Sequence, residues 1–200
     1  MELILLRHGE SLSVARPFED CPPDWLNQLT DRGRDQAMNA VSKVISIGQP
    51  TRIITSPVRR ALETAEVVST AFGTQPDVSA HLSEIFSVAR FTSQDDNHRS
   101  VLDFWTQFYS LSDQNRSALP AVADTLSFIN GTLLKLHEDE IVLLVSHGGR
   151  LELLIALLLN ASGLDRSLLA FRLECGNLHH LSLRFREGKL IFTLVAALNS

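Results

Sequence analysis

Two short segments hold the residues of this chain that are best suited to chemistry. Leu6-Arg7-His8-Gly9-Glu10 follows an apolar run near the start of the chain, and Ser146-His147-Gly148-Gly149 follows another near its end. Each apolar run is typical of a buried strand, and α/β sheets place their ligands at the carboxyl ends of strands. Two histidines and an arginine at one edge of a sheet would suit covalent phosphoryl transfer, with a neutral imidazole as nucleophile.

A third segment, Thr55–Ala61, predicts the start of a helix directly after a strand. Ser56 suits the N-cap and Pro57 the first helical position, which would place Arg59 and Arg60 in the first turn. Cations are unfavourable there because the helix dipole is positive at its N-terminus, and broken local rules are expected at functional sites. The two guanidiniums and the helical N–H groups would bind an anion well. The alternative is that both arginines point to solvent.

The neighbours of the two histidines fit the same chemistry. Arg7 would disfavour the imidazolium form of His8 and so keep the ring nucleophilic. Gly148 and Gly149 would let the backbone approach a bound oxyanion, although they can also form an ordinary turn beside an incidental histidine. Glu84 could protonate a leaving alkoxide, but most glutamates are solvated surface residues.

A metal site built from His8, His147 and Glu84 is the main rival interpretation. Two arginines beside these ligands would repel a cation. We therefore expect no metal and no other cofactor.

Apolar runs alternate with helical periods along most of the chain. Strands are predicted at 2–6, 52–55, 141–145, 178–185 and 190–195, with a short sixth at 77–79 and a hairpin turn at 186–189. Helices are predicted at about 31–47, 57–72, 119–136 and 148–160. This alternation predicts an α/β fold, a three-layer α/β/α sandwich with a mostly parallel central sheet.

The chain length is that of one domain, 1–200, with one interruption of the β/α alternation at about 87–119. This segment contains Phe91, Phe104, Trp105, Phe108 and Tyr109. It can be a lid over the site, or the aromatic residues can be one buried helix face; the two interpretations are compatible.

Composition and charge disfavour some classes of binding partner. A net charge of −5 argues against a nucleic-acid binder, and the most apolar stretch, 151–159, is too short to span a bilayer. Cys21 and Cys175 form no metal-binding motif and favour free thiols in a reducing cytoplasm. We expect a small phosphorylated substrate and no nucleic-acid or membrane partner; the oligomeric state, including a homodimer, stays open.

Five motifs in this order resemble the histidine phosphatase superfamily, the phosphoglycerate-mutase-like group. They are Leu6-Arg7-His8-Gly9-Glu10-Ser11, Leu29–Ala37, Ser56–Ala65, Leu82-Ser83-Glu84 and Val145–Gly149. The resemblance implies that His8 becomes phosphohistidine, that Arg7, Arg60 and His147 contact the phosphoryl group, and that Glu84 is the proton donor. It selects Arg60 over Arg59, because the family arginine directly precedes the alanine.

The chain departs from the family pattern at three places. Val14 stands where many relatives have an asparagine that contacts phosphate, so one neutral donor is missing or supplied elsewhere. The stretch 85–90 lacks the family's usual glycine and glutamate pattern, and Arg90 within it could contact a second anionic group or be solvated. The loop 13–29, with Cys21-Pro22-Pro23 and Trp25, is also unusual.

These observations predict a metal-independent phosphatase that hydrolyses a phosphate monoester of a small molecule through phosphohistidine on His8. A phosphoglycerate-type mutase is the alternative, but a mutase must exclude water, usually with a longer capping segment. A phosphate-binding relative without turnover is the other alternative, motivated by Val14 and the altered pocket segment.

Overall fold

The computed structural model describes residues 1–15, 27–85, 94–161, 174–186 and 189–198. Within these ranges six strands form one sheet, in the order β3-β2-β4-β1-β5-β6. The strands are β1 (Glu2–Arg7), β2 (Arg52–Thr55), β3 (Pro76–Val78), β4 (Ile141–Ser146), β5 (Leu178–Arg186) and β6 (Lys189–Leu198). The first four are mutually parallel, whereas β5 pairs antiparallel with β1 on one side and with β6 on the other. The expected mostly parallel sheet is confirmed; residues 187–188 of the predicted hairpin turn lie outside the described ranges.

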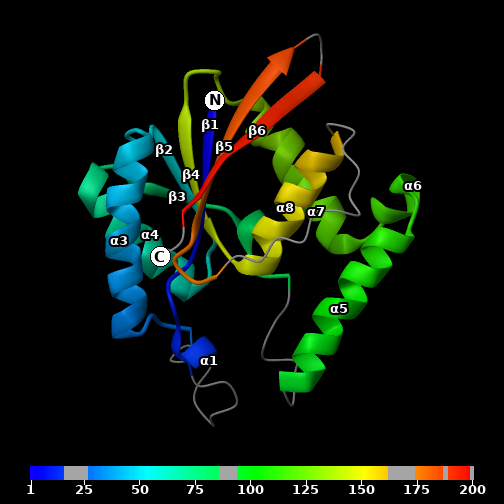
Figure 1. Cartoon of the computed structure of the whole chain (residues 1–200), viewed down its shortest axis with the longest axis horizontal. Helices are drawn as coiled ribbons and strands as arrows, with labels where there is room; N and C mark the ends of the chain where they lie inside the picture. The colour runs from blue at the N-terminus through cyan, green and yellow to red at the C-terminus, as the bar shows by residue number, and fades with distance from the viewer. Residues whose placement is uncertain (16–26, 86–93, 162–173, 187–188, 199–200) are drawn as a thin grey trace.

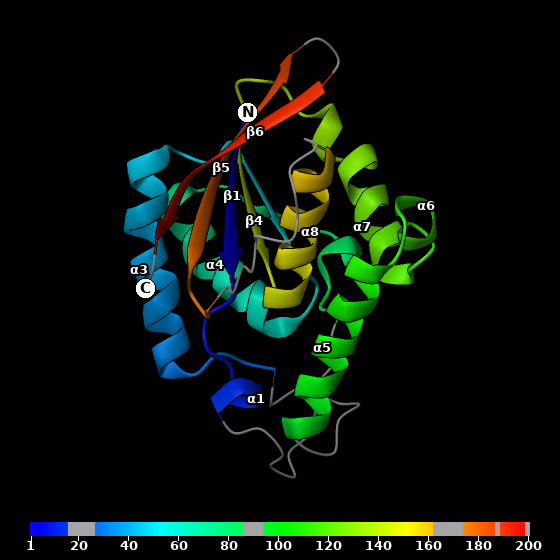
Figure 2. The ribbon, with the colours of Figure 1, turned by 45° about the vertical axis from the view of Figure 1, so that its right-hand side comes forward.

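Helices cover both faces of the sheet (Figures 1 and 2). One face carries α3 (Asp31–Ile47) and α4 (Arg59–Phe72), and the other carries α7 (Pro120–Gly131) and α8 (Gly148–Ala161). The helices α5 (Gln94–Ser110) and α6 (Asp113–Arg116) lie outside α7. Short helical turns complete the described chain: α1 (Leu12–Ala15), η1 (Ala80–Leu82) and η3 (Leu133–Lys135). The predicted three-layer α/β/α sandwich is therefore confirmed.

The alternation of side chains along β1 divides the core into two halves. Ile4 and Leu6 pack with the apolar faces of α3 and α4, whereas Leu3 and Leu5 pack with α7 and α8. All four side chains are fully buried. Burial on both faces explains why residues 3–6 of this strand are all apolar.

Two predicted helix boundaries are wrong. The helix expected over 119–136 ends at Gly131, and the 3₁₀ turn η3 follows, because Thr132 leaves the helical region at φ −124° and ψ −62°. Glycine and the β-branched threonine are both poor helix formers, which favours termination here. The helix expected from residue 57 begins at Arg59, with Val58 as an N-cap that contributes no side-chain bond.

The aromatic segment forms a helix over much of its described length. In α5, Phe108 is buried; it stacks with Phe104 and meets Trp105 edge to face, and both of these rings pack partly buried against the core. These contacts fit the interpretation of a buried helix face. A lid role stays a prediction, and residues 86–93, including Phe91 and Arg90, lie outside the described ranges.

Candidate active site

Both histidines follow the two central strands of the sheet. Arg7 of β1 pairs in register with Ser146 of β4, and the backbone N–H of His8 donates to the Ser146 carbonyl at 2.9 Å. The imidazole rings of His8 and His147 therefore lie side by side, with centroids 5.1 Å apart at 62°. Both residues are buried. The parallel pairing of β1 and β4 is thus what joins the two segments of the sequence.

The hydrogen bonds of His8 define its tautomer. Nδ1 lies 2.7 Å from the carbonyl oxygen of Gly9, which can only accept, so Nδ1 carries the proton. Nε2 lies 3.0 Å from Nε of Arg60, which can only donate, so Nε2 holds the lone pair. Burial, followed by the charges of Arg60 and Arg7, lowers the pKa of His8 well below its ordinary value. His8 is therefore a neutral ring whose nucleophilic nitrogen faces a guanidinium.

Two arginines carry positive charge near His8. Arg60, from the first turn of α4, is buried and donates from a terminal nitrogen to Oδ1 of Asn27 at 2.5 Å. The guanidinium of Arg7 packs against Gly148 at the start of α8, where an added Cβ would lie 3.3 Å from it. Both charges lower the pKa of His147 as well. A positively charged, desolvated region therefore surrounds the two histidines.

Arg59 does not belong to this region. Its Nε donates to Glu63 at 2.7 Å in a half-exposed ion pair one helical turn away. Of the two arginines of the motif, Arg60 reaches His8, whereas Arg59 pairs with Glu63. The helical period separates consecutive side chains by about 100°, so only one of the two can face the sheet edge.

His147 is fixed by Ser56. Ser56 Oγ lies 2.8 Å from Nε2 of His147 and accepts the backbone N–H of Val58 at 3.2 Å. Nδ1 of His147 is buried and has no hydrogen-bond partner among the described residues. Burial, followed by the charges of His8, Arg60, Arg7 and Arg150, lowers its pKa well below the ordinary value. Ser56 is therefore not the predicted N-cap of α4; its hydroxyl orients the second histidine.

Glu84 follows the short turn η1 and Ser83. Its carboxylate accepts the backbone N–H of Ile85 at 2.8 Å, and it is half-buried. Its negative charge opposes the lowering of the pKa of both Arg60 and Arg150, which places the carboxylate near both guanidiniums. Ser146 Oγ donates to the carbonyl of Leu82 at 2.6 Å and ties this segment to β4. The structure thus brings Glu84 to the same sheet edge as the histidines.

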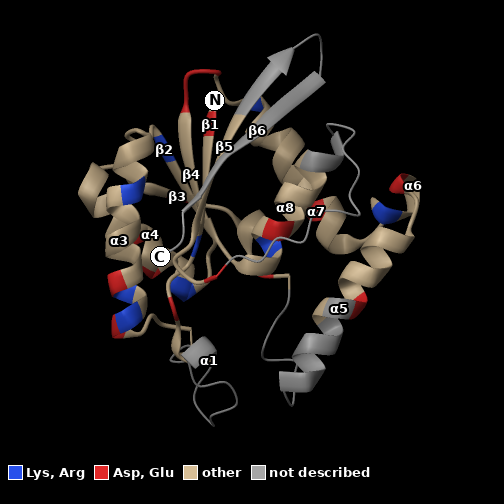
Figure 3. Ribbon diagram, in the orientation of Figure 1, with Lys and Arg blue, Asp and Glu red and all other residues tan. Residues whose placement is uncertain are grey.

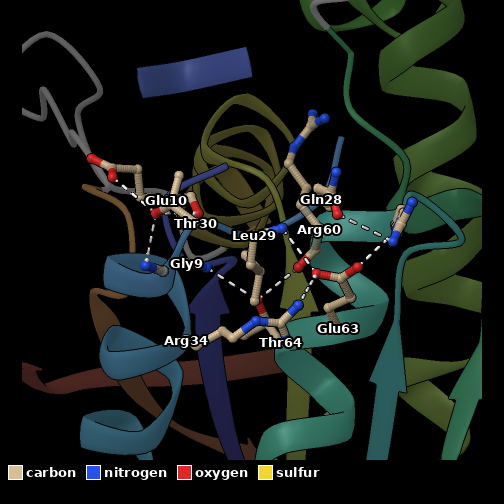
Figure 4. Close-up of polar contacts among 11 residues, drawn as sticks. Gly9, Glu10, Gln28, Leu29, Thr30, Arg34, Arg60, Glu63 and Thr64 are labelled. Atoms are coloured by element: carbon tan, nitrogen blue, oxygen red, sulfur yellow. Dashed lines mark hydrogen bonds and ion pairs between the residues drawn. The ribbon is translucent and has the colours of Figure 1, made fainter. Parts of the chain in front are cut away.

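The loop that carries His8 is held by α3 and α4, as Figure 4 shows. The backbone N–H of Gly9 donates to Thr64 Oγ1 at 3.1 Å, and that hydroxyl donates to the carbonyl of Arg60 at 2.7 Å. Glu63 accepts the backbone N–H of Leu29 at 2.9 Å. Gly9 and Gly33 meet backbone to backbone, since a Cβ on Gly9 would lie 2.2 Å from the Gly33 carbonyl. These contacts leave little freedom for the nucleophile loop.

The start of α8 supplies backbone donors. The first helical bond runs from Leu151 N–H to the His147 carbonyl, so the amides of Gly148 and Gly149 belong to the first turn, which has no acceptor within the helix. Such a turn favours anions. Both glycines therefore lie where the sequence predicted a phosphate contact.

Four contributors escaped the sequence argument. Asn27, Thr64 and Arg150 are joined to the site only by contacts between distant segments, which no local pattern reveals. Ser56 lay inside a recognised motif, but its motif position suggested a cap. The positions of Val14 and of the loop 16–26 do not test the missing neutral donor, because the Val14 side chain and that loop lie outside the described residues. Nor does the described part of the chain contain a group of three or more His, Cys, Asp or Glu placed to hold a metal ion.

The fold and site together are a mostly parallel α/β sheet with two histidines and two arginines at its carboxyl edge. The model of the histidine phosphatase superfamily (branch 1) matches residues 3–197, so the chain belongs to that superfamily. The resemblance inferred from the motifs is confirmed.

The individual relatives share about a quarter or less of their residues with this chain. The chain is 26% identical over 166 residues to a probable phosphoglycerate mutase, GpmB, of Citrobacter koseri, covering 80% of this chain and 75% of that protein. The fold of this chain matches that of a mycobacterial glucosyl-3-phosphoglycerate phosphatase solved with vanadate (TM-score 0.71, 22% identity, 98% and 97% of the two chains). It also matches a putative α-ribazole-5′-phosphate phosphatase of Escherichia coli (TM-score 0.68, 24% identity, 100% and 97%).

Among the residues described, no helix has the length and apolar character needed to cross a membrane.

Proposed function

We propose that this chain is a metal-independent phosphatase that hydrolyses a phosphate monoester of a small molecule through a phosphohistidine on His8. The observation that carries the proposal is the geometry of His8: a neutral ring, protonated on Nδ1 by its bond to Gly9, with the Nε2 lone pair beside the Arg60 guanidinium. The same guanidinium that bonds Nε2 can move its donor to a phosphoryl oxygen while Nε2 attacks phosphorus.

The first half-reaction transfers the phosphoryl group to the enzyme. Nε2 of His8 attacks phosphorus as the bond to the leaving oxygen breaks, and Glu84 gives its proton to that oxygen. Arg7, Arg60 and His147 hold the equatorial oxygens, which carry the charge of the transition state. The amides of Gly148 and Gly149 supply neutral donors to the same oxygens.

The second half-reaction releases phosphate. Glu84, now ionised, takes a proton from water as the water oxygen attacks phosphorus and the bond to Nε2 breaks. The products are inorganic phosphate and neutral His8, with Glu84 protonated again. Each step exchanges one P–O or P–N bond for another, so the arginines need only hold the charge in place.

The test is phosphate release from p-nitrophenyl phosphate and a panel of small phosphate esters in EDTA. His8→Ala is expected to abolish turnover with the fold intact, whereas His137→Ala, an exposed histidine outside the site, is the matched control and should keep full activity. Labelled phosphate trapped on the wild-type chain but not on His8→Ala would identify the phosphohistidine. A fully active His8→Ala protein, or activity lost in EDTA, contradicts the proposal.

Mutase activity is the second candidate, favoured by the 26% identity to a probable phosphoglycerate mutase. It predicts interconversion of phosphoglycerates with little free phosphate, and the same assay separates the two. A chain that binds phosphate through Arg7 and Arg60 but never traps label on His8 would be a binding protein without turnover.

The remaining expectations belong to the same proposal. The substrate is a small phosphorylated molecule rather than a nucleic acid or a membrane, and the enzyme works in the cytoplasm. A net charge of −5 and the absence of a metal-binding cysteine motif support them. Gel filtration and fractionation of the native cells would test the oligomeric state and the compartment.

A further inference from the structure

A buried guanidinium outside the recognised motifs connects three segments around Glu84. Arg150, in the first turn of α8, is only 5% exposed. Its Nε donates to the carbonyl of Ser83 at 2.8 Å, directly before Glu84 in the chain. One terminal nitrogen, Nη1, donates to Thr125 Oγ1 at 2.6 Å and to the carbonyl of Ala121 at 3.3 Å. Almost every donor of this side chain is therefore used to tie α8 to α7 and to the Glu84 segment.

Asp124 extends the same network. One carboxylate oxygen of Asp124 lies 3.0 Å from Arg150, and the other lies 2.5 Å from Nδ1 of His81. His81 belongs to η1, the turn that leads into Leu82, Ser83 and Glu84. His81, whose side chain is 43% exposed, is the outer link of this chain of contacts. Figure 3 shows basic and acidic residues gathered near the start of α8.

The segment 82–84 is thus held from both sides of His147. Ser146 Oγ bonds the Leu82 carbonyl, and Arg150 bonds the Ser83 carbonyl, at 2.6 and 2.8 Å. His147, Gly148 and Gly149 lie between these two donors in the chain. The position of Glu84 relative to the histidines is therefore set by direct bonds to the segment that carries the second histidine, and not by its own short loop.

A buried guanidinium is costly unless its donors are satisfied, so such a network needs a reason beyond packing. We propose that Arg150 is a positioning residue: with Asp124 and His81 it fixes the backbone of Ser83 so that the Glu84 carboxyl faces the leaving oxygen. This inference rests on the proposed phosphatase function and adds a residue to it. A misplacement of about 1 Å in a proton donor can cost about 100-fold in rate.

The test compares two substrates that differ in their need for a proton. The leaving group of p-nitrophenyl phosphate is a stable phenolate that needs little protonation. The leaving group of an alkyl phosphate such as glycerol phosphate is an alkoxide that must be protonated. The measured quantity is kcat/KM, which reports the steps up to loss of the leaving group. Glu84→Gln sets the reference: it should lower kcat/KM for the alkyl ester by about 100-fold or more and much less for p-nitrophenyl phosphate.

Arg150→Met should reproduce this selectivity in weaker form. We expect a loss of about 10-fold to 100-fold with the alkyl phosphate and less than about 3-fold with p-nitrophenyl phosphate. Arg150→Lys, which keeps one charged donor, should recover part of the loss. Because p-nitrophenyl phosphate turnover reports a folded site, a variant that merely unfolds is distinguished from one that misplaces Glu84.

Arg116→Lys is the matched control. Arg116 is equally buried and bonds the carbonyls of Phe108 and Leu111, but it lies in α6, away from Glu84. Arg116→Lys should change kcat/KM by the same factor for both substrates. An equal loss with both substrates in Arg150→Met, while Glu84→Gln stays selective, would overturn the role of Arg150 and leave the phosphatase proposal standing. No selectivity even in Glu84→Gln would overturn the proton-donor role and this inference together.

Discussion

Nε of Arg60 donates to Nε2 of His8 at 3.0 Å, so the cation that should hold the phosphoryl group and the nitrogen that should attack it are bonded to each other. This bond keeps the imidazole oriented and its lone pair directed at the place where an anion would enter. A phosphoryl oxygen that takes over the guanidinium donor frees the lone pair at the same moment. In the proposed mechanism, binding of the anion and exposure of the nucleophile are therefore one event.

Replacement of Arg60 by lysine should show the value of this arrangement. Lysine keeps the charge but cannot bond Nε2, Asn27 and a phosphoryl oxygen with one planar group. We expect kcat/KM for p-nitrophenyl phosphate to fall by about 100-fold to 1,000-fold. Arg59→Lys is the neighbouring control and should stay within about 2-fold, because Arg59 makes only a half-exposed pair with Glu63. Equal losses in both variants would contradict the assignment.

Removal of the Ser56 hydroxyl should disturb His147 without touching its ring. Ser56→Ala loses the 2.8 Å bond to Nε2 and leaves both ring nitrogens of a buried histidine without the protein donor or acceptor that orients them. A bond of about 1.4 kcal/mol corresponds to about 10-fold in kcat, which is the expected loss. Steady-state kinetics will measure it. Ser69→Ala, a buried serine farther along α4 that bonds Glu66, should leave kcat unchanged, and a normal rate in Ser56→Ala would remove Ser56 from the site.

Stability should fall as the pH drops below about 6.5. Burial, with Arg60 and Arg7, lowers the folded-state pKa of His8 well below 6.5, and burial likewise lowers that of His147. Below 6.5 the unfolded chain binds protons that the folded chain refuses, so the free energy of unfolding decreases with falling pH. Each ring can contribute up to about 1.4 kcal/mol per pH unit in this window.

Urea unfolding between pH 7.5 and 5 will measure this slope. His8→Asn removes one of the two rings and should flatten it, whatever the variant does to stability at pH 7.5. His137→Asn, an exposed histidine, should leave the slope as it is in the wild type. A slope unaffected by His8→Asn would show that His8 is protonated in the folded chain.

The close approach of Gly33 to the nucleophile loop predicts a large loss of stability on substitution. An added Cβ on Gly33 would lie 2.0 Å from the carbonyl oxygen of Glu10, so backbone must move. We expect Gly33→Ala to lower the free energy of unfolding by about 3 kcal/mol or more. Gly131→Ala is the opposite case: nothing lies within 4 Å, and alanine at the end of α7 should raise stability by about 0.5 to 1 kcal/mol. Urea denaturation separates the two, and a neutral Gly33→Ala would show that the loop can yield.

Local patterns were sufficient for most of the fold. The helix Asp31–Ile47 and the strand Arg52–Thr55 lie where periodicity and the apolar run predicted them, because each pattern reflects the burial of one face. Thr30 caps α3 by accepting the Gly33 N–H, as its residue type allows. The errors fell at helix ends. At the end of α7 the poor helix formers Gly131 and Thr132 stop the helix, and before α4 Ser56 bonds His147, 91 residues away, instead of capping.

The sequence by itself determined the family and the layered α/β architecture, and it predicted His8, Arg7, Arg60, Glu84 and His147 as site residues, because motif order and strand ends are encoded locally. Only the tertiary structure decided which ring nitrogen of His8 carries the proton, and that Ser56 orients His147. The network from Arg150 through Asp124 to His81 is of the same kind. Hydrogen bonds between segments far apart in the chain arise only when the sheet aligns those segments, and the residue types alone do not state which partners will meet.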